Sequence, residues 1–434
     1  MQSRREILLG IFQQSHYEPA LFRAWLRRHP APEEWDGFSD AAPVAWSPKA
    51  RMIFFLARIG SFGLIGRMPE ALLTARRLLK PGEDFTMRWI GWRNRKKISR
   101  IKFREIIGIT GSYGKTTTKE FVAHILAGAY RVHKTPDNIN TFLGIAQWIA
   151  RQDDMRDGDI LLIEMGAYHR GEIAAICRMV RPTVAIITGL NEAHRERFGS
   201  PDATARTKTE LIDALPPGGA VFWNNSSLLL REYLQTHRGK WPDKTVVSYG
   251  GADRETDGES ERSDFLKFFN DDAMSAGRAV SRRLGISDDV FEKQALLFRS
   301  PERRFAVSRA LGNRLIIDDS YNITVDGARA ACRLLKKIPR RKIGVFAGIP
   351  EGGGDTARIN TELGRMIGEV FDIILLRVTP MEHFIRAGLA EGGFPQERLI
   401  PYTESSEVEP LLRRIAQDND CIYFSAYDLP AIYL

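Results

Sequence analysis

Residues 105–119 read Glu-Ile-Ile-Gly-Ile-Thr-Gly-Ser-Tyr-Gly-Lys-Thr-Thr-Thr-Lys, a glycine-rich loop that follows an apolar run and opens into a helix-like stretch. The apolar run predicts a strand over residues 105–110, and residues 116–127 predict a helix. In such a loop, glycines let successive backbone N–H groups turn toward an anion, and the start of the helix adds its dipole. Lys115 can then reach the β and γ phosphates, and Thr116 can offer its hydroxyl to Mg²⁺. The stretch predicts an ATP site made by Gly111, Ser112, Gly114, Lys115, Thr116 and Thr117.

The spacing of these glycines differs from the common phosphate-loop pattern. In Gly-x4-Gly-Lys-Thr the first glycine would fall at Ile109, whereas the glycines here are Gly108, Gly111 and Gly114. The alternative interpretation is a chance glycine turn with an exposed lysine. A strand before the loop, a helix after it and Lys-Thr at the required place favour nucleotide binding by a particular subclass of phosphate-loop enzyme.

Length and composition are typical of a protein with several domains. The 434 residues exceed what one hydrophobic core usually serves, and the 43% of apolar residues suffices for burial. We therefore expect two or three domains. The three cysteines, Cys177, Cys332 and Cys421, are widely spaced and show neither a metal-ligand nor a disulfide pattern. This cysteine usage predicts a reducing, cytoplasmic location.

The net charge of +9 is unevenly distributed along the chain. Residues 1–104 hold 20 Lys and Arg against 9 Asp and Glu, together with five of the eight tryptophans. Within them, the apolar run at residues 52–66 is too short to span a bilayer and contains Arg58. Two interpretations stay open: a helical domain with a solvated basic face, or peripheral contact with the anionic inner face of the cytoplasmic membrane. Nucleic acid fits less well and is not expected as a partner.

From residue 105 onward, short β-rich runs alternate with helix-like stretches, which is typical of a mostly parallel sheet covered by helices. The expected fold class is α/β. Besides residues 105–110, the expected strands are residues 160–164, 184–188, 220–223, 245–248, 314–318, 342–346, 372–376 and 421–424.

Interruptions of this alternating pattern indicate loops and domain boundaries. The polar, acidic stretch at residues 251–264 predicts an exposed loop, and residues 271–284 predict a helix that stops at Gly285. A new α/β unit starts after Ser300 and Pro301. The expected domains are a basic, mainly helical N-terminal segment (1–104), a phosphate-loop central domain with a mostly parallel sheet (105–300) and a Rossmann-like C-terminal α/β domain (301–434).

Polar side chains follow three of the expected strands. Glu164 would place a carboxylate at the carboxyl end of the sheet beside the phosphate loop, where it can hold Mg²⁺. His194 follows the strand at residues 184–188 and can contact a metal or a phosphate, although a lone histidine usually does neither. Asp318 and Asp319, after another strand, suit ribose or amine recognition. Each of these residues, taken alone, can also be an ordinary polar residue in a turn.

Five motifs, in this order along the chain, resemble those of the Mur ligases. They are Gly108 to Lys119; Glu164-Met-Gly-Ala with Arg170-Gly-Glu-Ile; Glu192-Ala-His194 with Phe198-Gly-Ser200; Lys208-Thr-Glu-Leu-Ile; and Ile317-Asp-Asp-Ser-Tyr-Asn322. The resemblance covers about residues 105–434. It implies an ATP-dependent ligase that joins a peptide carboxylate to an amine through an acyl phosphate and releases ADP and phosphate. The implied substrates are small molecules, namely a cell-wall peptide precursor and an amino acid or a dipeptide such as D-alanyl-D-alanine.

The resemblance also implies roles for individual residues. Lys115 would hold the transferred phosphate, and Thr116, Glu164 and His194 would serve the magnesium ions. Lys208 matches a lysine that is carbamylated in the family, which turns a cation into an anion able to orient a second metal. The residues implied near the rest of the nucleotide are Asn138, Asn140, Asn270, Arg304, Asp319 and Asn322.

Some residues depart from the family pattern. Phe269 stands where the family usually has histidine, and Asn322 is followed by Ile-Thr-Val rather than Ala-Asn-Pro. Residues 1–104 lack the length pattern and the glycine-rich turns of the family's usual UDP-binding domain, so a UDP-linked substrate is not predicted. Two rival functions stay open: a phosphate-loop NTPase that acts as a switch on nucleic acid, and a non-catalytic ATP-binding scaffold at the membrane.

Overall fold

The computed structural model of the chain forms two compact units, Met1–Trp92 and Arg93–Leu434. The division between them falls inside the long helix α4 (Met68–Ile98). The domain boundaries expected at residues 104 and 300 stay predictions. The structure describes Leu8, Phe12 and residues 19–28, 52–53, 55–57, 68–137, 139–167, 169–190, 201–250, 271–321, 325–349 and 355–426.

The described part of the first unit is helical, as the sequence predicts. Helix α2 (Pro19–Arg28) and the first turns of α4 contribute to a small apolar cluster, in which the rings of Phe12 and Phe22 lie 4.7 Å apart. Helix α4 continues beyond this cluster with a proline, Pro81, inside it. Within the described residues, no helix is long and apolar enough to cross a membrane. The cluster consists of Leu8, Phe12, Phe22, Ile53, Ala57, Leu72, Leu73 and Ala75.

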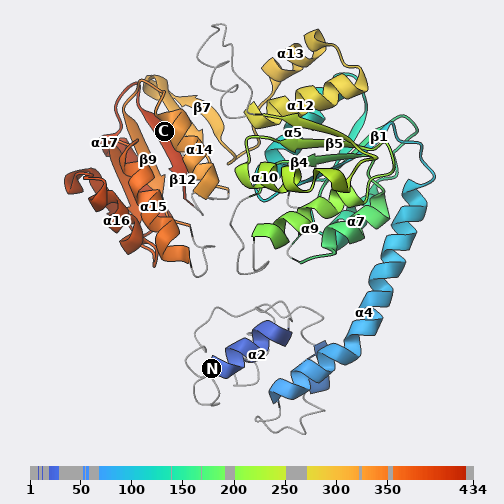
Figure 1. Cartoon of the computed structure of the whole chain (residues 1–434). Coiled ribbons are helices and arrows are strands. Elements are labelled where there is room, and N and C mark those ends of the chain that lie inside the picture. Colours follow the sequence, from blue (N-terminus) through green and yellow to red (C-terminus); the bar gives the residue numbers. More distant parts are fainter. Residues whose placement is uncertain are drawn as a thin grey trace. The chain divides into compact units, whose positions relative to one another are not determined.

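The second unit begins with a six-stranded sheet in which every neighbouring pair of strands is parallel. The strand order is β2-β3-β1-β4-β5-β6, so the strand that leads into the glycine-rich loop lies inside the sheet (Figure 1). Both faces of its inner strands are buried, which explains their unbroken apolar sequences. The strands are β1 (Glu105–Thr110), β2 (Val132–Lys134), β3 (Ile160–Glu164), β4 (Val184–Ile187), β5 (Ala220–Asn224) and β6 (Thr245–Tyr249).

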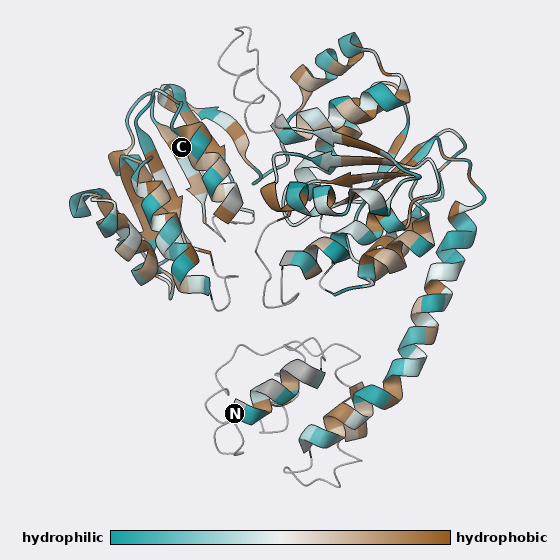
Figure 2. Ribbon diagram, in the orientation of Figure 1, coloured by the Kyte–Doolittle hydropathy of each residue, from teal (hydrophilic) through white to brown (hydrophobic). Residues whose placement is uncertain are grey.

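Helices cover both faces of this sheet. On one face, α5 and α12 pack together so closely that a Cβ atom on Gly277 would lie 2.8 Å from the Phe121 ring. On the other face, α9 approaches β1, where a Cβ atom on Gly108 would lie 2.7 Å from Leu211. The apolar strands therefore lie between helices whose outer surfaces are hydrophilic (Figure 2). The helices are α5 (Lys115–Ala127), α6 (Phe142–Arg151), α7 (Glu172–Val180), α9 (Pro201–Asp213), α10 (Leu228–Thr236), α12 (Asp271–Leu284), α13 (Asp288–Leu297) and the short 3-10 helix η3 (Arg238–Lys240).

A second six-stranded sheet follows, with the order β11-β10-β9-β12-β8-β7. Its strands are parallel except for β7, which pairs with β8 in the antiparallel direction at one edge. The prediction of a Rossmann-like α/β fold here is confirmed, with this antiparallel edge as an addition. The elements are β7 (Ala306–Ala310), η4 (Leu311–Asn313), β8 (Arg314–Asp318), α14 (Val325–Leu335), β9 (Lys342–Phe346), α15 (Thr356–Gly368), β10 (Ile373–Arg377), α16 (Glu382–Glu391), η6 (Gln396–Arg398), β11 (Leu399–Tyr402), η7 (Ser405–Glu407), α17 (Val408–Ile415) and β12 (Cys421–Ser425).

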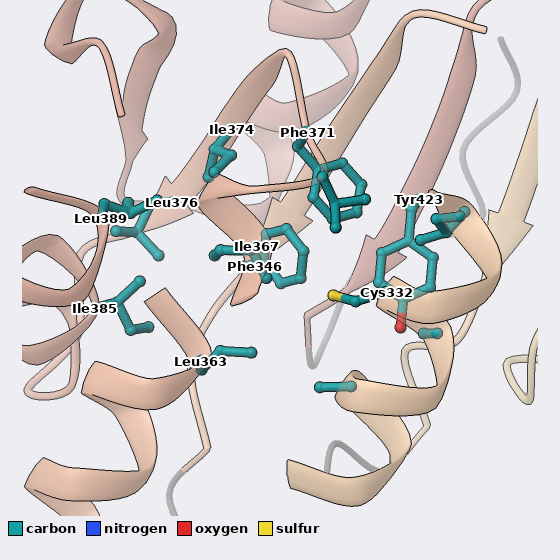
Figure 3. Close-up of a cluster of buried hydrophobic side chains, with 14 of the residues drawn as sticks. Cys332, Phe346, Leu363, Ile367, Phe371, Ile374, Leu376, Ile385, Leu389 and Tyr423 are labelled. Atoms are coloured by element: carbon teal, nitrogen blue, oxygen red, sulfur yellow. The ribbon is translucent and has the colours of Figure 1, made fainter. Parts of the chain in front are cut away.

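The main core of this second sheet lies between the sheet and helices α14, α15 and α16 (Figure 3). Phe346 and Phe371 meet edge to face, with ring centroids 5.2 Å apart, and Tyr423 packs beside both rings. Helix α17 covers the other face through Val408 and Leu412. Truncating a buried leucine of such a core to alanine costs about 2–5 kcal/mol of the free energy of unfolding.

Nearly all expected elements are present at the expected residues. The strands at 105–110, 160–164, 314–318 and 342–346 have the predicted bounds, β10 is shifted by one residue from the predicted 372–376, and the other four differ by one residue at one end. Helix α12 stops where predicted: Gly285 adopts a φ of +75°, and the Ile286 N–H donates to the Ser281 carbonyl, 3.0 Å away. The expected loop at residues 251–264 lies outside the described residues.

Candidate active site

The glycine-rich loop joins β1 to α5 and lies against the end of β4. The Ser112 N–H donates to the Gly189 carbonyl at 2.8 Å, and the Thr188 hydroxyl donates to the Tyr113 carbonyl. Gly111 has a φ of +154°, and a Cβ atom there would lie 2.1 Å from the Thr188 hydroxyl oxygen. Glycine is therefore required at this point for the loop to pack against the neighbouring strand end.

Gly114 places Lys115 at the first position of α5. Gly114 is the N-cap and adopts the left-handed conformation, with a φ of 73°. The Lys115 side chain folds back over the loop, and its Nζ donates to the carbonyls of Gly111 at 2.8 Å and Ser112 at 3.3 Å. Burial lowers the pKa of Lys115, the Glu164 carboxylate opposes this effect and Arg304 adds to it. The ammonium thus lies at a helix N-terminus, where an anion binds favourably.

Glu164 closes the other side of this loop, from the end of β3. Because β1 pairs with β3, Ile109 lies opposite Glu164, and the carboxylate lies beside the first turn of α5. The Thr116 hydroxyl donates to Glu164 Oε2 at 2.9 Å, and the Asn140 amide donates to Oε1 at 3.2 Å. The Glu164 N–H donates to the Thr135 hydroxyl at 3.0 Å. The strand-end carboxylate and the loop threonine, predicted separately, are therefore in contact.

This pair fits a magnesium ion by the chemistry of its donor atoms. Magnesium prefers oxygen ligands, usually one or two carboxylates together with phosphate and water. Thr116 supplies a hydroxyl, and Glu164 supplies a buried carboxylate beside it. Among the residues that the structure describes, no three His, Cys, Asp or Glu side chains stand close enough to hold a metal ion by themselves. The chain's own ligands would therefore be few, as expected for an ion that arrives with a nucleotide.

Lys208 approaches the same site from helix α9. Its side chain is buried, and its Nζ donates to the Ala167 carbonyl at 3.4 Å. Burial lowers the pKa of Lys208 to about 7; the Lys115 charge lowers it further, whereas Glu172 and Glu210 raise it. Near neutral pH, a large fraction of this amine is therefore uncharged and nucleophilic.

Glu210 was not singled out from the sequence, yet it orders the segment next to Lys208. Its carboxylate accepts hydrogen bonds from the Gly171 N–H at 2.6 Å and the Ala174 N–H at 3.0 Å, which satisfies the start of helix α7. The only signal in the sequence was its position two residues after Lys208. Which backbone it would meet depends on the packing of α9 against α7.

Arg304 and Asp319 lie in the part of the unit that contains the second sheet. The Arg304 guanidinium stacks on the Tyr321 ring at 3.8 Å from its centroid. Its neighbours Arg303 and Phe305 both have positive φ angles, 60° and 55°, which are costly for residues other than glycine. Phe305 is buried, and the Arg303 side chain donates to the Ser320 hydroxyl at 2.9 Å. The strained turn is thus fixed on both sides of Arg304.

Asp319 accepts a hydrogen bond from the Tyr423 hydroxyl at 2.9 Å. Burial raises the pKa of Asp319 to about 7, although this hydrogen bond and the Phe305 N–H oppose the shift. Of the other predicted residues, Thr117 lies in the first turn of α5. Four lie outside the described residues: Asn138, His194, Asn270 and Asn322.

This chain is similar to a known protein family. Residues 109–277 match the model of the Mur ligase middle domain. A UDP-N-acetylmuramoyl-tripeptide–D-alanyl-D-alanine ligase of Synechocystis is 28% identical over 349 residues, 77% of this chain and 73% of the relative. The Bacillus subtilis protein of the same name is 26% identical over 74% of this chain and 72% of its own length.

Solved structures share the fold. The MurF ligase of Thermotoga maritima, in complex with ADP, has a TM-score of 0.65 at 22% identity, covering 78% of this chain and 80% of that one. MurF of Acinetobacter baumannii has a TM-score of 0.64 at 22% identity, covering 79% of this chain and 77% of that one. The match over residues 109–277 and these relatives confirm the resemblance to Mur ligases expected from the sequence motifs.

Proposed function

We propose that this protein is an ATP-dependent, ADP-forming ligase that adds an amino acid or a dipeptide such as D-alanyl-D-alanine to a cell-wall peptide precursor. The observation that carries the proposal is the convergence of Lys115, the Thr116–Glu164 pair and the buried Lys208 near the carboxyl ends of the inner strands of the first sheet. A simple nucleotide switch needs the first two features but has no use for the third. The relatives' names supply the substrate class.

The reaction begins with transfer of the γ-phosphoryl group of ATP to a carboxylate oxygen of the peptide precursor, which yields an acyl phosphate and ADP. The amine then attacks the acyl carbon, and phosphate leaves as the amide forms. Lys115 would hold the phosphoryl group and stabilise its charge during transfer. Magnesium, held by Thr116 and Glu164, would neutralise further phosphate charge; the donor atoms fit this role, and His194 is a further proposed ligand.

Lys208 is proposed to act as its carbamate. The uncharged amine adds to CO2 and loses one proton, so that a cation next to Lys115 becomes an anion. The lowered pKa of Lys208 supports this step, because it supplies the uncharged amine near neutral pH. Activity should fall in buffer freed of CO2 and return on addition of bicarbonate. Equal activity in both buffers would contradict carbamylation.

The remaining sites are proposed from the family resemblance. Arg304 would approach the nucleotide as the acyl phosphate forms, because a guanidinium stabilises phosphoryl charge and helps to exclude water, which would hydrolyse the intermediate. The same proposal treats residues 105–300 and 301–434 as the central and C-terminal ligase domains. The other residues proposed to contact the nucleotide are Asn138, Asn140, Asn270, Asp319 and Asn322.

Residues 1–104 are proposed to bring a cytoplasmic enzyme to the inner face of the membrane. On α4, Phe85, Trp89 and Trp92 repeat at helical spacing and are 72%, 49% and 59% exposed. By their spacing on the helix, the basic residues Arg88 and Lys96 fall next to this row, which suits an anionic lipid surface. In flotation with anionic vesicles, the full chain should rise with the lipid and residues 105–434 should not. Equal behaviour of the two would contradict this part of the proposal.

The ligase itself is tested by phosphate release with Mg–ATP, a muramoyl-tripeptide acceptor and D-alanyl-D-alanine. Release should require both substrates, and mass spectrometry should find the condensed pentapeptide. ATP hydrolysis that depends on nucleic acid and ignores amines would instead support the NTPase switch. ATP binding without any product, across acceptors with and without the UDP group, would support the scaffold.

A further inference from the structure

Lys119 is a charged group at the phosphate loop to which the mechanism above assigns no role. It lies on α5, one turn after Lys115, and its side chain is completely buried. Its Nζ makes no hydrogen bond within the described residues. A lysine is rarely buried in this way unless its charge is compensated, because removing an ammonium from water is costly. Its surroundings must therefore explain why it is there.

Three carboxylates, from three different segments, surround the Lys119 ammonium. Its Nζ lies 3.3 Å from Glu120 Oε1, 3.4 Å from Glu164 Oε2 and 3.8 Å from Asp137 Oδ1. The three carboxylates therefore compensate the charge of the Lys119 ammonium itself.

The contact with Glu164 connects Lys119 to the proposed magnesium site. Glu164 Oε2 also accepts the Thr116 hydroxyl at 2.9 Å, and Oε1 accepts the Asn140 amide. Lys119 and Thr116 lie three residues apart on α5 and so share one side of the helix. Both oxygens of the Glu164 carboxylate therefore accept a hydrogen bond, and the Lys119 ammonium lies next to Oε2, the oxygen that Thr116 contacts.

We propose that Lys119 is a positioning residue: a built-in counter-ion that fixes Glu164 for the metal and opposes the binding of a divalent cation until ATP is present. The inference rests on the proposed magnesium role of Glu164. A fixed positive charge at this distance repels a second cation, and the effect is strong in a buried site. The phosphates of ATP supply the negative charge that offsets this repulsion, so the metal enters with the nucleotide.

The test measures magnesium binding to the nucleotide-free protein by calorimetry and by thermal unfolding, with potassium chloride at matched ionic strength as the reference. Lys119→Met removes the charge and keeps the length of the side chain. We expect its Mg²⁺ affinity to rise by at least about tenfold over that of the natural protein, with a rise in Tm on addition of Mg²⁺ alone. In the natural protein, Mg²⁺ alone should leave Tm unchanged.

Two further variants separate charge from structure. Lys134→Met is the matched control, because Lys134 also pairs with Glu120 but is half-exposed, and among the described residues it is Lys119, not Lys134, that forms an ion pair with Glu164. It should respond to Mg²⁺ like the natural protein, and Lys119→Arg, which keeps the charge, should do the same. If Lys119→Met does not fold, Lys119→Gln replaces it, since its amide is polar but carries no charge.

Equal Mg²⁺ affinity in the natural protein and in Lys119→Met or Lys119→Gln would overturn the proposal and leave Lys119 as a structural ion pair. An increase in Lys134→Met equal to that in Lys119→Met would overturn it as well, since any lost cation would then suffice. The readout needs neither ATP nor substrate. Failure of the ligase assignment would therefore leave this result intact, and failure here would leave the ligase assignment intact.

Discussion

The two sheets of the second unit each have a buried group whose pKa lies near neutrality, but the two groups have opposite charges. Lys208, beside the first sheet, has its pKa lowered to about 7, and Asp319, at the end of a strand in the second, has its pKa raised to about 7. Burial is the largest cause of both shifts. The comparison shows that burial alone does not define a catalytic group; what differs is the surroundings.

Around Lys208 are the phosphate-loop lysine and two glutamates, whereas around Asp319 are a tyrosine hydroxyl, one aspartate and Arg304. The first sheet also has a glycine-rich loop that opens into a helix at the end of β1, whereas β8 is followed by Asp319-Ser-Tyr-Asn322. We therefore expect the first sheet to supply most of the phosphate chemistry and the second to supply a smaller, positional contribution.

The largest expected effect comes from Lys115→Met. It removes the ammonium that would stabilise the transferred phosphoryl group, so the rate of product formation should fall by about 10³-fold or more. Lys134→Met, on the edge strand β2, is the control and should keep its activity. A Lys115→Met protein that is folded, as judged by circular dichroism, and retains most of its rate would contradict the claim that the first sheet supplies most of the phosphate chemistry.

Arg304→Met should lower the rate less, because Arg304 lies beside the second sheet, from which we expect the smaller contribution. We expect kcat to fall by about 10²-fold, with the Kd of ATP changed only a few-fold, since most phosphate contacts would remain. Arg309→Met, on the exposed strand β7, serves as the control. A large loss of ATP affinity with an unchanged kcat would show that Arg304 binds nucleotide rather than acting in the transfer.

The two buried groups should give the free energy of unfolding opposite pH dependences. For Lys208, the unfolded state binds more protons between pH 7 and 10.5, so this group makes stability rise with pH. For Asp319, the folded state binds more protons between pH 3.8 and 7, so this group makes stability fall as pH rises. The measurement is urea unfolding at a series of pH values in buffer without CO2. Lys208→Met should reduce the rise in the free energy of unfolding above pH 7, and Asp319→Asn should reduce its fall between pH 3.8 and 7. Unchanged slopes in both variants would contradict the assigned shifts.

The smallest effects concern packing. Gly108→Ala would bring a Cβ atom to 2.7 Å from Leu211, and Gly344→Ala, in the second sheet, would bring one to 2.3 Å from the Phe346 ring. Each should lower the free energy of unfolding by about 1–3 kcal/mol through overpacking. Gly239→Ala, where a Cβ atom meets nothing within 4 Å, should change it little. Chemical unfolding of the three variants measures this, and a stable Gly108→Ala protein would show that α9 can shift away from β1.

Much of this fold could be predicted from the sequence, because the inner parallel strands are buried on both faces and therefore read as apolar runs. The strands that were not predicted lack this signal. Strand β2 has only three residues, β7 is an exposed edge and β11 contains Pro401. Strand β7 pairs with β8, which follows it directly in the sequence, whereas β2 and β11 pair with β3 and β10, from which a helix separates them in the chain.

The site shows the same division between local and tertiary information. Lys115 and Thr116 could be identified because the loop, strand and helix are contiguous in the sequence. The burial of Lys119 could not, since an exposed helix lysine has the same spacing and its three carboxylates come together only on folding. Glu210 is similar, because its partners are backbone groups of another helix.

The most direct test of the central claim follows one oxygen atom. The acceptor peptide is prepared with its carboxylate labelled with ¹⁸O and is incubated with the full-length protein, Mg–ATP and D-alanyl-D-alanine. An acyl phosphate mechanism transfers one labelled oxygen to the released phosphate, so we predict ¹⁸O-labelled phosphate in amounts equal to the amide product. Unlabelled phosphate, with or without product, would contradict the account.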